Sequence, residues 1–233
     1  MRNSGIEHEK PSAATRDRIL EVARELFARK GFAGNGIRDI ARAAGVSVSM
    51  VSYHFSGKLG VLRAIMTAFF DDYTQVVEAA LREETDLESR VVRLVGETTM
   101  FLKFRQDDFR IVVTELPRVS DETGEFERRY LHLIRGLTDE LLIPEISASA
   151  RERGCIDAEE LHRIVGPALL SMVYSTFLFG RGLELAYCFE RDEAFFAEYT
   201  SLVSRLILAG VREVASPPPA EQPGQGANGP SVE

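Results

Sequence analysis

The chain has 233 residues, 45% of them hydrophobic and 27% charged, with a net charge of −8 and two cysteines. This is the composition of a soluble globular protein with room for one or two hydrophobic cores. No apolar run approaches the ~20 residues that a membrane span requires, and the polar first residues do not resemble a signal peptide. We therefore expect a cytoplasmic protein with reduced thiols at Cys155 and Cys188, a disulfide between them being the alternative.

The charge is unevenly distributed along the chain. Between Lys10 and Leu62 there are nine basic and four acidic residues, whereas from Arg63 onward there are 18 basic and 30 acidic residues. A basic N-terminal segment concentrates positive potential where a phosphate backbone binds. Taken alone, the asymmetry is equally compatible with a random excess of charge on solvated helix faces.

Helix signals cover nearly the whole chain and strand signals are almost absent, so the predicted fold class is all-α. The first helix is predicted over residues 15–31, with Thr15 as its cap. Two short helices are predicted over 37–45 and 47–55, and a longer one over 57–81.

The rest of the chain predicts longer helices with readable caps. Thr85 and Glu88 form one capping box, and Asp157 opens another. We expect a kink at Gly166-Pro167 and a helix end at Gly180 and Gly182. The predicted helices cover 85–104, 107–116, 120–142, 145–153, 157–179 and 192–214.

Residues 37–55 carry the most specific pattern, namely two short helices separated by a tight turn. Gly45 permits a positive φ in that turn, as a helix-turn-helix requires. In that motif the second helix enters the major groove of DNA. An isolated helical hairpin with a glycine turn is the alternative. The outward face of the second helix would present Ser49, Met50, Ser52, Tyr53 and His54, which suit base edges and phosphates.

Three stretches resemble the TetR/AcrR family of transcription regulators. Residues 15–32 look like its first helix, 37–47 like its second helix and turn, and 51–58 like its recognition helix and the start of helix four. The resemblance implies an N-terminal three-helix helix-turn-helix DNA-binding domain and a C-terminal helical ligand-binding and dimerisation domain. The implied domains are a flexible tail (1–12), the DNA-binding domain (13–60), the ligand-binding and dimerisation domain (61–215) and a disordered tail (216–233).

The resemblance also implies which residues contact DNA. Asn35 and Gly36 stand where the family usually has a threonine or serine, so we expect Asn35 to cap helix two without that hydroxyl contact. Val48 replaces a frequent polar residue, which favours apolar contact with thymine methyl groups. The alternatives are a packing role for Tyr53 and a merely solvated His54. The expected DNA contacts are Arg16, Arg38, Ser47, Val48, Ser49, Met50, Ser52, Tyr53, His54 and Lys58.

The last two predicted long helices are apolar on more than one face. A surface helix of a monomer needs a single apolar stripe, so the second stripe predicts a two-fold dimer. A helix central to a monomeric core is the alternative. The expected dimer interface is Leu169, Met172, Val173, Phe196, Tyr199, Val203 and Leu206.

Aromatic residues on the central helices suggest a pocket for a small apolar or aromatic effector, although any one of them is equally an ordinary core residue. The expected lining is Phe101, Phe104, Phe109, His132, Arg135, Tyr174 and Phe177.

An enzyme is the main rival. The four histidines, His8, His54, His132 and His162, show no metal-ligand spacing, and there is no phosphate-cradling glycine loop. We therefore expect no catalytic residues, metal or cofactor. The second rival is a ligand-free architectural module, which would cover DNA diffusely in a footprint. The preferred hypothesis is a homodimeric repressor on a palindromic double-stranded DNA operator, released by its effector, with no membrane partner.

Overall fold

The computed structural model describes residues 12–82, 86–116 and 161–215, and within 124–139 residues 124, 128–129, 132–133, 135–137 and 139. All regular structure in these residues is helical, which confirms the all-α fold class. Both predicted tails before residue 12 and after 215 lie outside the described residues. So do the helix predicted over 145–153, the capping box at 157–160 and Cys155, whereas Cys188 is a free, exposed thiol.

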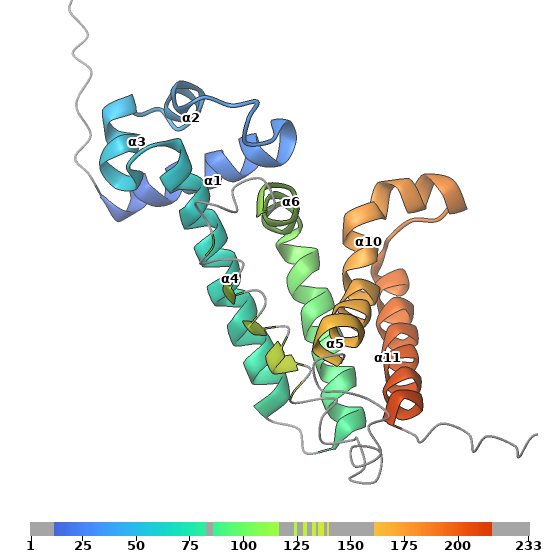
Figure 1. Cartoon of the computed structure of the whole chain (residues 1–233). Coiled ribbons are helices and arrows are strands. Elements are labelled where there is room, and N and C mark those ends of the chain that lie inside the picture. Colours follow the sequence, from blue (N-terminus) through green and yellow to red (C-terminus); the bar gives the residue numbers. More distant parts are fainter. Residues whose placement is uncertain are drawn as a thin grey trace, which may run out of the picture.

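Three helices form a compact unit at one end of the molecule (Figure 1), which we call the head. They are α1 (Ala13–Lys30), α2 (Ile37–Ala43) and α3 (Val48–Phe55). Ile19 of α1, Ile40 of α2 and Val51 of α3 are fully buried, so the helical spacing of apolar residues determines the inner face of each helix. Gly45, between α2 and α3, has φ +66°, as the turn requires.

Three predicted caps are wrong by a few residues. The α1 cap is Ser12, whose Oγ accepts the backbone N–H of Thr15 at 3.1 Å, while Thr15 is buried. The α5 cap is Asp86 rather than Thr85, and it accepts the N–H of Ser89 at 2.9 Å. At both helix starts two polar residues within one turn compete for the cap, and the sequence alone does not rank them.

The cap of α2 is also not the expected Asn35. Gly36 occupies the cap position, and its backbone N–H donates to Oδ2 of Asp39 at 2.9 Å. The hydrogen bond from Gly36 lowers the pKa of the Asp39 carboxyl below its ordinary 3.8. Because the unfolded chain then binds more protons, this contribution to stability is complete above pH 3.8 and is lost as the pH falls through the lowered pKa.

Helix α4 (Lys58–Arg82) runs from the head along the length of the rest of the molecule (Figure 1). It crosses the predicted domain boundary after residue 60 without a break. Its inward face is buried along most of its length and includes Leu62, Ile65, Met66, Phe70 and Tyr73. One continuous helix therefore belongs to both halves of the molecule.

The remaining described helices form what we call the body. They are α5 (Leu87–Phe104), α6 (Gln106–Glu115), the π-helical turn η2 (Leu161–Val165), α10 (Gly166–Tyr187) and α11 (Glu193–Ala215). Helix α5 packs between α4 and α11, and α6 packs against both α1 and α4. The predicted kink coincides with the change from π to α geometry at Gly166.

The predicted helix end at Gly180 and Gly182 is wrong, because α10 continues to Tyr187. Gly180 is instead a site of close approach. A Cβ atom there would lie 2.2 Å from Cζ of Arg191, whose guanidinium donates to the carbonyl of Thr176 at 3.0 Å. Glycine at this position leaves room for the guanidinium of Arg191 to lie against α10, and it does not mark a turn of the backbone.

Two helical stretches, Arg163–Tyr187 and Glu193–Glu213, are long and apolar enough to cross a membrane by length and composition alone. This overturns the expectation that no segment approaches that limit. A third of each apolar window is buried inside the chain. Helices that pack on two sides within a protein have the same composition, so the observation is weak evidence for a membrane.

Gly60 makes the turn from α3 into α4 possible, because a Cβ there would lie 1.5 Å from the carbonyl oxygen of Phe55. We predict that Gly60→Ala lowers the free energy of unfolding by about 2–3 kcal/mol, measured by urea denaturation. Gly96→Ala is the matched control, since its Cβ would meet only Cγ2 of Thr200 at 3.9 Å. That variant should be more stable by about 0.5–1 kcal/mol. Equal effects of the two substitutions would contradict this account of Gly60.

Candidate nucleic-acid interface

The outward face of α3 is exposed and free of charge. Val48 is 38% exposed and Tyr53 is 71% exposed, and Ser49 and Ser52 lie on the same exposed side. The opposite face, with Val51 and Phe55, is buried in the head. Short hydroxyl groups, one methyl-bearing side chain and one phenol are therefore available for contact with a DNA groove.

The first turn of α3 is organised by Ser47. Its Oγ accepts the N–H of Met50 at 3.2 Å and lies 2.8 Å from the hydroxyl of Ser49. Ser47 therefore serves as the helix cap, and both hydroxyls are exposed at the start of the helix. Met50 is half-buried, so it presents only part of its side chain.

Arg16 and His54 flank the end of α3. The guanidinium of Arg16, from α1, lies over the Phe55 ring at 5.3 Å, and its side chain is 47% exposed. His54 is half-buried, and its Nε2 is buried without a hydrogen-bond partner among the described residues. Arg38 is exposed near the start of α2. Arg16 therefore offers a cation beside α3, and Arg38 is an exposed cation on α2.

Lys58, which the family resemblance implies to be a DNA contact, also binds groups inside the protein. Its Nζ donates to the carbonyls of Phe32 at 3.0 Å and Asn35 at 2.9 Å, and it lies 3.9 Å from the centre of the Phe32 ring. Two of its three N–H groups are thus used inside the protein. Asn35 is buried and donates to the carbonyls of Leu26 and Gly31. These contacts hold the loop between α1 and α2 against the start of α4.

Helix α6 binds the head at both of its ends through buried carboxylates. Near its C-terminus, Oε1 of Glu115 accepts the backbone N–H of Phe32 at 3.2 Å. Near its N-terminus, Asp108 forms an ion pair of 3.0 Å with Arg24 of α1. Both carboxylates belong to residues that are only 3% exposed.

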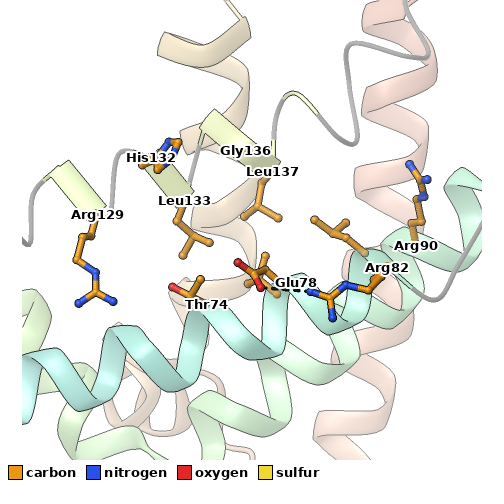
Figure 2. A pocket seen from close by; sticks show the side chains of 11 residues that line it. Thr74, Glu78, Arg82, Arg90, Arg129, His132, Leu133, Gly136 and Leu137 are labelled. Carbon is orange, nitrogen blue, oxygen red and sulfur yellow. Dashed lines mark hydrogen bonds and ion pairs between the residues drawn. The ribbon is translucent and has the colours of Figure 1, made fainter.

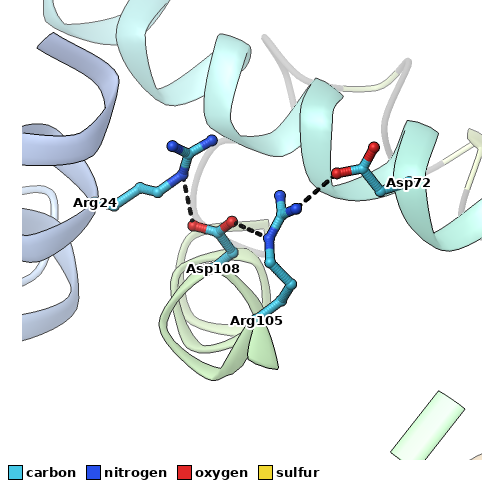
Figure 3. Close-up of polar contacts among 4 residues, drawn as sticks. All are labelled: Arg24, Asp72, Arg105 and Asp108. Atoms are coloured by element: carbon cyan, nitrogen blue, oxygen red, sulfur yellow. Dashed lines mark hydrogen bonds and ion pairs between the residues drawn. The ribbon is translucent and has the colours of Figure 1, made fainter. Parts of the chain in front are cut away.

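Arg105 extends the ion pair to α4 (Figure 3). Its Nε donates to Asp108 at 2.8 Å and its Nη1 to Asp72 at 2.6 Å. Burial acts to lower the pKa of Arg105, but the hydrogen bonds and negative charges of Asp72 and Asp108 together raise it above its ordinary value. Four alternating charges thus connect α1, α6 and α4.

The sequence did not identify Arg24, Asp108 or Glu115. The i, i+3 spacing of Arg105 and Asp108 is a local signal for a pair on one helical turn. The contacts to α1 join segments far apart in the chain, and no local pattern predicts them.

The residues expected to line one effector pocket lie at different places. Phe109 and Tyr174 line an apolar cavity of about 190 Å³ between α4, α5, α6 and α10. In its wall the hydroxyls of Tyr73 and Tyr174 are hydrogen bonded at 2.8 Å. Phe101 is half-buried beside this cavity and stacks on Tyr73 at 5.3 Å.

The other predicted pocket residues do not line this cavity. Phe177 is buried between the rings of Phe109 and Phe196. Phe104 is 76% exposed, and Arg135 is also exposed. His132 lines a separate, larger cavity at the far end of α4.

The residues expected at the dimer interface divide between two faces. Val173, Phe196 and Val203 are buried in the core of the chain, while Leu169 and Tyr199 are half-buried. Met172 is 38% exposed and Leu206 is 50% exposed. Further exposed apolar residues on the same two helices and the preceding turn are Ile164, Leu178, Phe179 and Leu202.

Comparisons with known proteins agree with this geometry. Residues 19–65 match the family model for bacterial regulatory proteins of the tetR family. The chain is 40% identical over 67 residues to the probable HTH-type transcriptional regulator YttP of Bacillus subtilis, covering 29% of this chain and 32% of YttP. It is 34% identical over 80 residues to the HTH-type transcriptional repressor KstR2 of Rhodococcus jostii, covering 33% of this chain and 39% of KstR2. The chain thus spans less than half the length of these two relatives.

Solved structures share the fold over most of the chain. A TetR-family transcriptional regulator from Bordetella parapertussis superposes with a TM-score of 0.65 and 22% identity, covering 82% of this chain and 95% of that one. A putative fatty acid metabolism regulator of Clostridium perfringens gives 0.64 and 19%, covering 83% and 97%. At such identities the likeness establishes the fold alone.

The buried carboxylate of Asp108 should contribute strongly to stability, because two guanidinium groups depend on it. We predict that Asp108→Asn lowers the free energy of unfolding by about 3 kcal/mol, measured by urea denaturation. Asp107→Asn changes an exposed neighbour and should alter stability by less than about 0.5 kcal/mol. Similar losses in both variants would show that the Arg24–Asp108–Arg105 contacts are not the cause.

Proposed function

Because the chain belongs to the tetR family of bacterial regulatory proteins, we propose that it is a cytoplasmic, sequence-specific DNA-binding transcriptional repressor without enzymatic activity. The observation that carries the proposal is the exposed, uncharged face of α3, with Tyr53 71% exposed, together with Arg16 beside α3 and the exposed Arg38 on α2. Cations of this kind bind phosphates, and an uncharged helix face suits base edges.

The proposed active species is a homodimer on a palindromic operator. Support comes from the exposed apolar residues of α10 and α11, since a second copy would bury them. Leu202 and Leu206, each 50% exposed, lie one turn apart on α11, and Phe179 on α10 is 64% exposed. A two-fold axis through this surface would present two α3 helices to half-sites about one DNA turn apart, ~34–36 Å.

The proposed effector is a small apolar or aromatic molecule that binds the cavity beside Tyr73 and Tyr174. The volume of about 190 Å³ is close to that of an apolar cavity that holds one benzene ring. The two tyrosine hydroxyls are the polar side-chain groups of this lining and suit a single hydroxyl or carbonyl on the ligand. Thermal stabilisation by highly polar compounds alone, in a ligand screen, would count against this effector class.

Release from DNA would follow from the contacts between head and body. The cavity is lined by α4 and α6, and these helices bind the backbone of Phe32, Lys58 at its carbonyl and Glu115 at its N–H. A ligand that binds better when α4 and α6 are displaced would reorient the head and change the spacing of the two α3 helices. Operator affinity then falls by at most the ratio of two ligand affinities, one for the protein with α4 and α6 displaced and one for the protein with both helices in place.

DNA binding is tested by removing the phenol of Tyr53. We predict that Tyr53→Ala weakens operator binding about tenfold in a gel-shift titration, with unchanged thermal stability because the side chain is exposed. Tyr187→Ala is the matched control, since Tyr187 is 74% exposed at the end of α10.

Footprinting tests whether binding is sequence-specific. A bounded, palindromic footprint in the DNA upstream of the gene for this protein, weakened by added salt, is the supporting result. Diffuse coverage that neither variant alters would instead indicate an architectural protein.

The dimer is tested by placing charge on α11. The double variant Leu202→Glu/Leu206→Glu should have the mass of one chain in light scattering at micromolar concentration, because burying two carboxylates costs more than the interface gains. Val92→Glu changes a residue of α5 that is 49% exposed and should leave the dimer intact. A monomeric mass for the unmodified protein would contradict the dimer directly.

A further inference from the structure

A second cavity, of about 630 Å³, lies beside the C-terminal half of α4 (Figure 2). Helix α4 forms one side, Arg90 of α5 contributes at one end, and five described residues lie opposite α4, namely Arg129, His132, Leu133, Gly136 and Leu137. It is about three times as large as the cavity beside Tyr73 and Tyr174.

Part of the lining of this second cavity is apolar. Val77 and Leu81 come from α4, and Leu133 and Leu137 come from the opposite segment and point toward α4 in Figure 2. Val77 and Leu137 are buried, while Leu81 and Leu133 are half-buried. A hydrocarbon chain or ring lying between these residues would be removed from water on two sides.

The polar part of the lining is predominantly cationic. Among the residues that the structure describes, Arg82, Arg90, Arg129 and His132 line the cavity together with the carboxylate of Glu78. The surrounding sequence has the opposite balance, with 30 acidic and 18 basic residues from Arg63 onward. The three arginines therefore form a positively charged site within a part of the chain that is negatively charged overall.

Arg82 and Arg129 each form an ion pair and still retain donors. Arg129 pairs with Asp71, which lies outside the lining, and Arg82 pairs with Glu78 at 3.4 Å. A guanidinium carries five N–H groups, and one carboxylate occupies two of them at most. The Arg82 side chain is 73% exposed, so it can turn toward a bound anion at little cost.

We infer that this cavity binds an anionic amphiphile, with its apolar body against the leucines and valine and its carboxylate or phosphate at the arginines. The apolar lining alone would accept a neutral hydrocarbon, and the arginines alone would accept a small inorganic anion. Their combination in one cavity favours a molecule that carries both groups. This site is separate from the apolar effector cavity proposed above, and its occupation does not require DNA.

The ligand class is tested with probes that share one chain and differ in the head group. Isothermal titration calorimetry of the unmodified protein, without DNA, would compare decanoate, decyl phosphate, decanol and decylamine below their micelle concentrations. Decanoate or decyl phosphate should bind at least about tenfold more tightly than decanol, and decylamine most weakly. The stronger of the two anions distinguishes a carboxylate ligand from a phosphate ligand. Equal affinities for decanoate, decyl phosphate and decanol would overturn the inference.

The location is tested by changing charge while keeping side-chain length. Arg82→Met/Arg129→Met should weaken decanoate about tenfold or more and leave decanol unchanged. Glu78→Gln should tighten decanoate severalfold, because it removes a negative charge that lies beside the arginines of the lining. Arg110→Met, on the exposed side of α6, is the control and should change neither ligand.

These outcomes separate the inference from the proposed function. Glu78 has a side chain 59% exposed, so Glu78→Gln remains informative even where the double variant fails to fold. No change in decanoate affinity with Glu78→Gln and with the folded double variant would show that the anion binds elsewhere. A protein that fails to bind an operator could still bind decanoate in the calorimeter. A protein that binds an operator could equally fail to bind decanoate. The two claims can therefore fail independently.

Discussion

The backbone of Phe32 is a point at which two helices of the body hold the head. Its N–H is bound by Glu115 of α6 and its carbonyl by Lys58 at the start of α4. Asn35 holds the same loop to the end of α1 from within. Because the backbone N–H and carbonyl of Phe32 cannot change rotamer, the side chains of Glu115 and Lys58 must meet them at a fixed place. These bonds therefore act together with the core packing and the Arg24–Asp108 ion pair to orient α3 relative to the body.

Helix α6 has an unusual charge arrangement for so short an element. It is 10 residues long and presents a buried carboxylate to the head near each end, Asp108 to Arg24 and Glu115 to the Phe32 N–H. Buried charges are costly to leave unpaired, so these contacts either persist together or are lost with a large penalty. This favours two discrete positions of the head over a continuous range, which is what a switch requires.

The sequence was informative where the signal is local, and it failed where two distant segments meet. The head helices, the Gly45 turn and the family resemblance follow from residues close together in the chain. At the caps of α1 and α5, neighbouring polar residues compete, and the sequence does not rank Ser12 above Thr15. Periodicity identified two apolar faces on α11 but could not tell which one the chain buries for itself. The structure resolves this, with Val203 inside and Leu206 outside.

Helix α4 is a single unbroken helix, so a rotation at one end displaces the other end. Its 25 residues span about 36 Å at 1.5 Å per residue. Lys58 lies at one end, and the arginine-lined cavity lies at the other. A rotation of only about 5° about one end would move the other by about 3 Å, more than a hydrogen bond tolerates. A small displacement of α4 at the end that bears this cavity is therefore enough to separate Nζ of Lys58 from the two carbonyls that it binds.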